Sequence, residues 1–447
     1  MDSLIPVFGN LAFTLVAFVV ALSVIIAIHE YGHYIVGRWS GIKAEVFSLG
    51  FGPVLASRVD KHGTRWQIAA LPFGGYVKFL GDKSAASDKA DPDVLAELTP
   101  EERRHTMHGA PLWARAATVF AGPAFNFILS FLIFTAFVLY FGIQKEPLVV
   151  SEVKPHPAAV EGLAPGDTLV AIEGVPAATA EQMNAAADEI EPSPSLDYTV
   201  LRDGQEIVVE GPWLTPPIAS DFSPDSAAAA AGMEPGDVVV SVNGTTIADF
   251  QELNDATRNS EGKPLNLGIW RNGETLTLSV TPQRRDTPAP DGGFETRYLI
   301  GMHGGAVIDF ETETPGVIEA MGYGAERLWF VVDMSVQGIW SVINQDISTC
   351  AVSGPITIAK TSGEVAAKGV SDFIFFIAVI SAAVGFMNLI PVPVLDGGHL
   401  VFHAWEALTG HPPPDRAMNV MMGIGLFLVL SLMVFAFGND IWCRFIL

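Results

Sequence analysis

The chain has 447 residues, of which 49% are hydrophobic, and its formal net charge is −24 at pH 7. A mean hydropathy of +0.36 at this length predicts a membrane protein of several domains, and the acidic balance argues against nucleic acid as a partner. Only Cys350 and Cys443 are present, so neither a disulfide framework nor a thiolate metal cluster is expected.

The first apolar stretch runs from Leu11 to Gly37 and is long enough to cross a bilayer. It contains His29, Glu30 and His33. Two histidines four residues apart on a helix lie on one face and can share a metal ion, and the Glu beside them is then free to act as a base. Ionisable groups at membrane depth are costly and usually mark a functional site. A buried metal site is therefore favoured over a packed polar pair.

Basic residues gather in one loop. Residues 38–115 carry 11 Lys and Arg against 9 Asp and Glu, whereas residues 144–371 carry 12 against 33. Because positive charge marks the cytoplasmic side, we expect the 38–115 loop inside and the acidic region outside, together with both termini. The first span then enters from outside, and its two histidines lie near its cytoplasmic end.

Residues 45–80 are predicted to form a β-hairpin that turns at residues 60–63. The segment is too apolar for a solvated loop and too broken for a span, which favours a hairpin dipping into the membrane; an ordinary cytoplasmic hairpin is the alternative. Residues 82–110 are predicted as a polar insert with a helix start at Thr99. In the second span, Asn126 must find a hydrogen-bond partner inside the membrane.

An internal repeat follows the second span. GLAPGDTLVAIEG at 162–174 recurs as GMEPGDVVVSVNG at 232–244, which predicts two tandem β-rich modules. The G-x-x-P-G-D turn before an apolar strand resembles PDZ domains of bacterial envelope proteases. That resemblance implies binding of peptide ends along a sheet edge, with a purely structural spacer as the alternative.

Residues 284–315 are expected to form a linker with at most one strand, and 317–345 an amphipathic helix on the outer membrane surface or against the spans. The third span ends in two prolines that break its helix before Asp396. Because this span also enters from outside, Asp396 is expected at the depth of His29 and His33.

The predicted fold is a polytopic α-helical membrane protein of four transmembrane helices with a membrane-associated hairpin and two tandem modules. The expected segments are the first transmembrane helix 1–40, the cytoplasmic loop 41–114, the second transmembrane helix 115–143, the modules 146–215 and 216–283, the linker and amphipathic helix 284–371, the third transmembrane helix 372–400 and the fourth 419–438.

The motifs resemble a known family. H-E-x-x-H in the first span, with N-x-x-P-x-P-x-L-D-G in the third, is similar to the site-2 protease family of intramembrane zinc metalloproteases. The tandem modules and the G-P-x-x-N at 122–126 narrow the resemblance to the group of bacterial regulator of sigma-E proteases.

The resemblance implies one Zn²⁺ per chain, bound by His29, His33 and Asp396, with a fourth position left for water. Glu30 would take the proton of that water. Asn388 and Asn126 would contact the substrate backbone or the developing oxyanion. His399 is expected to neighbour the site without binding metal.

The family's role implies cleavage of single-pass membrane proteins within the lipid bilayer, in regulated intramembrane proteolysis at the bacterial inner membrane. The expected substrate is an anti-sigma factor already trimmed outside, in an envelope stress response, and signal-peptide remnants are a further class. The alternatives are a non-catalytic PDZ-bearing receptor or scaffold, which the intact Glu30 argues against, and a metal transporter, which would need several intramembrane sites.

Overall fold

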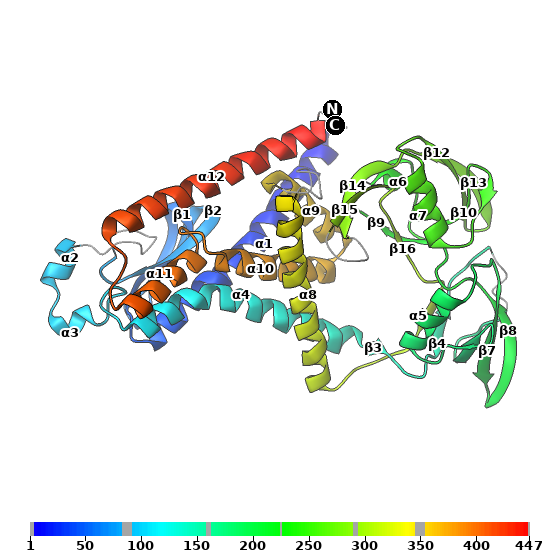
Figure 1. Cartoon of the computed structure of the whole chain (residues 1–447), viewed down its shortest axis with the longest axis horizontal. Helices are drawn as coiled ribbons and strands as arrows, with labels where there is room; N and C mark the ends of the chain where they lie inside the picture. The colour runs from blue at the N-terminus through cyan, green and yellow to red at the C-terminus, as the bar shows by residue number, and fades with distance from the viewer. Residues whose placement is uncertain are drawn as a thin grey trace. The chain divides into compact units, whose positions relative to one another are not determined.

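The computed structural model describes six stretches of the chain, at residues 4–82, 92–157, 162–223, 226–288, 294–344 and 354–445 (Figure 1). The chain divides into two compact units. The first comprises Met1–Ala136, Ile318–Ile339 and Val352–Leu447, and the second comprises Phe137–Val317 and Trp340–Ala351. Cys350 lies outside the described residues.

Four helices in the described part of the chain are long and apolar enough to cross a membrane, which confirms the four predicted spans. They are α1 (Leu4–Trp39), α4 (Leu112–Phe141), α10 (Val370–Leu389) and α12 (Asp415–Phe445). Only a minority of their side chains are buried within the protein, and in a bilayer the lipid tails would cover those that face outward. The insert contains two short helices, α2 (Pro92–Glu97) and α3 (Pro100–Arg103), and Thr99 caps α3 as expected.

Three further helices pack on the spans. The predicted amphipathic helix is α8 (Val317–Asn344), whose Val331 is buried with Phe134 of α4 and Ala378 of α10. An unpredicted helix, α9 (Pro355–Lys368), lies along α1. The Asp440 carboxylate of α12 accepts hydrogen bonds from backbone groups at the start of α9. The third, α11 (Asp396–Thr409), follows the broken end of α10.

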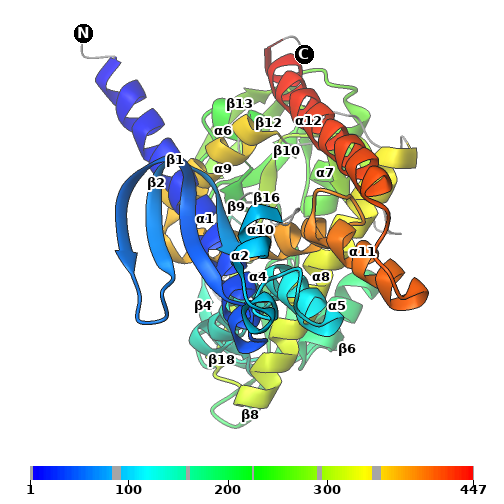
Figure 2. The same ribbon diagram turned by 90° about the vertical axis from the view of Figure 1, so that its left-hand side faces the viewer.

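The predicted hairpin exists but is folded twice. Strands β1 (Ala44–Val59) and β2 (Arg65–Phe79) bend so that Ser48 pairs with both Tyr76 and Gln67. The result is a mixed sheet of four strand segments in the order 75–79, 44–49, 65–68 and 54–59. Segment 44–49 runs parallel to 65–68, and the two outer pairings are antiparallel. The sheet lies beside α1 (Figure 2). A single hairpin was expected because no sequence pattern shows that one strand segment pairs with a neighbour on each of its two sides.

The two ends of this sheet differ in polarity. The bends at one end expose Phe51, Leu55 and Leu71. At the other end the Asp60 carboxylate accepts hydrogen bonds from Tyr34 of α1 and from Trp66, each at 3.1 Å. Burial raises the pKa of Asp60, but these bonds and two backbone N–H donors outweigh it and lower the pKa to about 2. The sheet therefore has an apolar end and a charged end that is fastened to α1.

The second unit contains the repeat as two matching four-stranded sheets, which confirms the two predicted β-rich modules. The first has the order β6-β5-β7-β8 and the second the order β11-β10-β12-β13. The strands of the first are β5 (Thr168–Ile172), β6 (Val175–Pro176), β7 (Leu196–Arg202) and β8 (Gln205–Gly211), with helix α5 (Ala180–Glu189). Those of the second are β10 (Val238–Val242), β11 (Thr245–Thr246), β12 (Leu265–Arg271) and β13 (Glu274–Val280), with helices α6 (Ala227–Ala230) and α7 (Phe250–Asn259).

The same ion pair occurs in both modules and explains why the motif is repeated. The Asp of each G-D turn is buried and pairs with the Arg at the end of the third strand in its sheet order. Arg202 Nε donates to Asp167 at 2.7 Å in the first module, and Arg271 Nε donates to Asp237 at 2.6 Å in the second. A buried carboxylate needs such a partner, so Asp and Arg recur together.

The segment after the second module differs from the expected linker. It contains β14 (Gln283–Pro288), β15 (Phe294–Leu299), β16 (Met302–Gly304), β17 (Ile308–Phe310) and β18 (Thr312–Glu313). Its last three strands pair backward, with β9 (Ala219–Phe222), β4 (Val150–Val153) and β3 (Ile143–Gln144) respectively. Strands of two or three residues whose partners are distant in the sequence give no local pattern, so they were not predicted. Each module thus takes an edge strand from beyond the expected boundary at residue 283.

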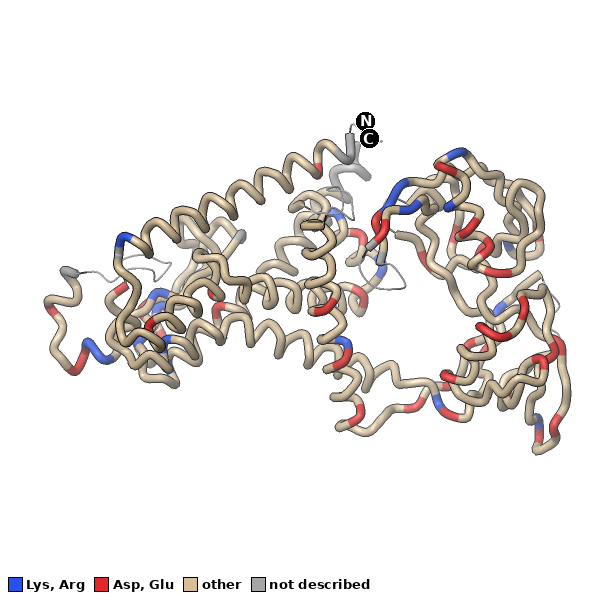
Figure 3. Tube along the Cα trace, in the orientation of Figure 1, with Lys and Arg blue, Asp and Glu red and all other residues tan. Residues whose placement is uncertain are grey.

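Charge separates as the sequence indicated. Acidic side chains are spread over the second unit, while Lys and Arg gather in the first unit near α3 and the start of α4 (Figure 3).

Candidate metal centre

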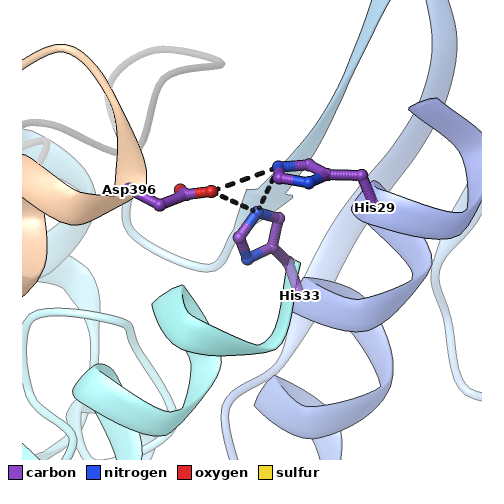
Figure 4. A group of neighbouring side chains, drawn as sticks. All are labelled: His29, His33 and Asp396. Atoms are coloured by element: carbon purple, nitrogen blue, oxygen red, sulfur yellow. Dashed lines mark hydrogen bonds and ion pairs between the residues drawn. The ribbon is translucent and has the colours of Figure 1, made fainter. Parts of the chain in front are cut away.

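Three predicted ligands meet in the first unit (Figure 4). His29 and His33 come from adjacent turns of α1, and Asp396 is the first residue of α11. The Asp396 Oδ2 atom lies 3.2 Å from His29 Nε2 and 3.5 Å from His33 Nε2, and the two Nε2 atoms are 3.1 Å apart. The fold therefore brings together the three groups that were predicted to lie at one membrane depth, although His29 and Asp396 are 367 positions apart in the sequence.

These residues fit a zinc ion. Asp396 Oδ2 is buried and has no hydrogen-bond partner among the described residues, and it faces two imidazole nitrogens. Two nitrogens and one carboxylate oxygen are a usual ligand set of catalytic zinc, which keeps a fourth position open. The site is partly buried, as a reaction that needs controlled access to water requires.

Helix α4 orients both histidines. His33 Nδ1–H donates to the Thr118 carbonyl oxygen at 2.8 Å. A carbonyl can only accept, so the proton resides on Nδ1 and the lone pair of Nε2 faces the ligand cluster. Thr118 was not identified from the sequence, because its backbone carbonyl and not its side chain accepts this hydrogen bond.

Asn126 lies against His29 and not against an open cleft. Its side chain is fully buried, and its amide nitrogen Nδ2 lies 3.2 Å from His29 Nδ1. The Asn126 Oδ1 atom has no partner among the described residues. With the amide turned so that this oxygen faces the ring, it accepts Nδ1–H and leaves His29 Nε2 free to bind metal. Asn126 thus contacts a predicted metal ligand, and its contact with substrate stays a prediction.

Two glycines allow the close approach. A Cβ at Gly122 of α4 would lie 2.3 Å from His33 Nε2, inside the ligand cluster. A Cβ at Gly397 would lie 2.3 Å from the Leu389 carbonyl, so only glycine lets α11 fold back on the end of α10. Pro391 and Pro393 end α10 before this turn. The L-D-G motif therefore positions Asp396 through its backbone.

Glu30 and Asn388 occupy different surroundings. Glu30 lies beside the sheet, since a Cβ at Gly75 would be 2.9 Å from its Cγ. Asn388 lies in the last turn of α10 and donates from Nδ2 to the Val384 carbonyl of its own helix at 3.1 Å. His399 lies one turn after Asp396 and is not part of the ligand cluster. The roles of Glu30 and Asn388 stay predictions.

An ion pair holds the helix that carries Asp396. Arg115 at the start of α4 donates to the Glu406 carboxylate of α11 at 2.6 Å, and both side chains are largely buried. His403 lies nearby, where burial and the positive charge of Arg115 lower its pKa to about 4, so it is neutral at pH 7. Sequence reasoning missed this pair because its members are 291 residues apart.

Comparison with known proteins adds a family to this geometry. The profile of peptidase family M50 matches residues 17–432. A protein of Rhizobium meliloti whose name places it among zinc metalloproteases is 36% identical over 435 residues, covering 97% of each chain. The regulator of sigma-E protease RseP of Salmonella typhimurium is 33% identical over 462 residues, covering 96% of this chain and 99% of that one.

One solved structure matches part of the chain. It is the HtrA3 PDZ domain bound to a phage-derived ligand, at 22% identity and a TM-score of 0.14, covering 26% of this chain and 82% of that one. The description of the two modules as PDZ-like rests instead on their repeated motif and their matching sheets.

Proposed function

Because the chain belongs to peptidase family M50, a family of zinc metalloproteases, we propose that it cleaves single-pass membrane proteins within their transmembrane segments. The observation that carries the proposal is the convergence of His29, His33 and Asp396 on helices of a multi-pass membrane protein. A site for hydrolysis in such helices acts on bonds that lie in the bilayer. We propose an anti-sigma factor as the substrate class, as the motif resemblance implies; the name of the Salmonella relative refers to the regulation of sigma-E.

The proposed chemistry assigns one role to each group. His29, His33 and Asp396 hold one Zn²⁺ per chain. When bound, this ion would polarise the scissile carbonyl and acidify a water molecule. Glu30 takes the proton of the attacking water and returns it to the leaving amine. Thr118 and Asn126 keep each histidine with its Nε2 lone pair toward the ligand cluster. Asn388 is proposed to contact the substrate near the cut.

The test is cleavage of a co-expressed single-pass membrane protein. The purified chain is expected to contain about one zinc per chain and to cut that protein within its span. A zinc chelator should abolish cleavage, and added Zn²⁺ should restore it. A chain that holds zinc but cuts no membrane protein, including substrates with short exterior tails, would support the receptor alternative.

We propose that the substrate binds as an added strand beside Glu30. A helical segment hides its peptide bonds in its own hydrogen bonds and must unwind before attack. Residues 75–79 form one edge of the sheet and adjoin Glu30. Phe79 N–H donates to Asp82, and Leu80 N–H donates to Lys43 before β1, so alternate N–H groups along this strand point away from the sheet. By this alternation the N–H of Gly75 is available to a substrate strand.

Gly75→Pro is therefore expected to slow cleavage about tenfold more than Gly75→Ala, with zinc retained. Both variants place a Cβ against Glu30, but only proline removes the backbone donor. Rates on one substrate and the zinc content of both proteins measure the difference. Equal rates for the two variants would remove this edge from the mechanism.

We propose an inner-membrane location with the 38–115 loop in the cytoplasm and the second unit, with both termini, in the periplasm. The unequal charge of the two regions supports it. In a chain lacking Cys350 and Cys443, cysteines at the exposed positions Glu152 and Glu274 should react with a membrane-impermeant reagent in intact spheroplasts. Cysteines at Glu97 and Lys61 should react only after the membrane is opened, and the reverse labelling would overturn the orientation.

A further inference from the structure

A cavity of about 530 Å³ lies between α1 and the sheet. That volume is typical of sites for small molecules. Ala27, Ile28 and Tyr31 line it from α1, and Phe47 and Ile68 line it from the sheet. Its walls are largely apolar, and the exposed side chain of Ile68 places its opening at the surface.

The cavity is separate from the metal centre. Ala27 and Tyr31 each lie two positions from His29, which is about 200° around the helix. The cavity therefore faces the side of α1 opposite to the ligand cluster. Neither a metal ligand nor Glu30 lines it. None of the residues to which the proposed cleavage assigns a role lines this space.

One end of the cavity carries a positive charge. Arg58 lines it from the outer strand segment 54–59 and has no carboxylate within ion-pair distance among the described residues. Asp60, two residues further on, is engaged by Tyr34 and Trp66. Arg58 pairs across the strands with Trp66 next to the charged end of the sheet, whereas Ile68 lies toward the apolar end. The cavity thus has a basic end and an apolar end, as an anionic amphiphile requires.

We propose that this cavity binds an anionic membrane phospholipid, with an acyl chain between α1 and the sheet and its phosphate on Arg58. A guanidinium is suited to phosphate because its donors match two phosphate oxygens. Basic pockets beside transmembrane helices select anionic headgroups for this reason. The inference depends on the chain lying in a membrane and is independent of its proposed cleavage activity.

The test is lipid retention by the purified full chain, measured by native mass spectrometry with phosphatidylglycerol and with phosphatidylcholine of the same acyl chains. Arg58→Ala is expected to lower phosphatidylglycerol retention about tenfold, the factor for one charge-assisted hydrogen bond. Ala56→Phe fills the cavity and should lower retention of both lipids. Lys61→Ala removes an exposed base in the turn that follows segment 54–59 and does not line the cavity, so this variant should retain phosphatidylglycerol as the unmodified chain does.

Zinc content confirms that each variant is folded. Unchanged retention in Ala56→Phe, or equal losses in Arg58→Ala and Lys61→Ala, would show that lipid binds elsewhere or by net charge alone. A photoreactive residue at position 56 supplies a second readout. Capture of phospholipid supports the proposal, whereas capture of a co-expressed substrate span would assign the cavity to substrate and overturn it.

Discussion

Replacement of Glu30 with Gln is expected to lower peptide-bond cleavage at least about 100-fold while about one zinc per chain remains. The reason is that Glu30 follows His29 directly but lies outside the ligand cluster, beside the sheet. Gln is nearly the same size and cannot accept a proton from water. Zinc content by mass spectrometry and cleavage of a co-expressed single-pass substrate measure the two effects separately.

The matched controls are His33→Ala and Asp396→Ala. Each leaves only two protein ligands, which hold zinc poorly, so these variants should lose metal and activity together. If Glu30→Gln loses its zinc as they do, Glu30 is a ligand or a packing residue and the assignment as a base is wrong. Cleavage at the unmodified rate with zinc bound would place the base elsewhere in the chain.

The metal ligands could be predicted from the sequence because each of them lies in a short sequence motif. The spacing of His29 and His33 follows the period of a helix, and the broken helix before Asp396 is visible in its prolines. Their common depth followed from counting both spans from the same side of the membrane. Four apolar stretches and one repeat likewise fixed the number of spans and the two modules.

The supporting contacts could not be predicted, since they depend on where distant backbone lies. The Thr118 carbonyl that orients His33 is chemically the same as every other carbonyl in α4. The pair of Arg115 and Glu406 joins helices with most of the chain between them. Asn126 was recognised as a buried amide that needs a partner, but nothing in the sequence says that this partner is His29.

The strand pairings failed for a related reason. Three strands of two or three residues, β16 to β18, exist only because β9, β4 and β3 supply their hydrogen bonds. Over a run of two or three residues, the strand propensity does not exceed the propensity to form a loop. The consequence is practical, because a cut at the expected boundaries of 146 and 283 would separate β16 and β17 from their partners.

Excision of the PDZ-like pair should therefore remove residues 143–313 as one piece. The cut ends are neighbours, since Ile143 pairs with Glu313, and a short Gly-Ser linker can join Gly142 to Thr314. The excised variant is expected to keep its zinc and to cut substrates with short exterior tails. Removal of 146–283 alone should instead give poorly folded protein, because β16 and β17 lose their partners β9 and β4.

The larger expected effect is a change in which substrates are cut. The modules contribute no metal ligand within the described residues, so we propose that they act before the zinc site, as a filter. A folded module of this length is roughly 25 Å across, which is enough to exclude a substrate with a bulky exterior domain. Trimming by another protease would remove that obstacle, and the new peptide end could dock on a module edge.

The excised variant should then cut full-length substrates that the intact chain spares, and the gain should vanish when Glu30→Gln is added. Band shifts of tagged full-length and pre-trimmed substrates, compared in the same cells, measure the discrimination. A zinc-loaded excised variant that still spares full-length substrates would place the filter outside the second unit's modules. The first alternative is α8, which exposes Trp329 and Phe330 while its buried face packs on α4 and α10.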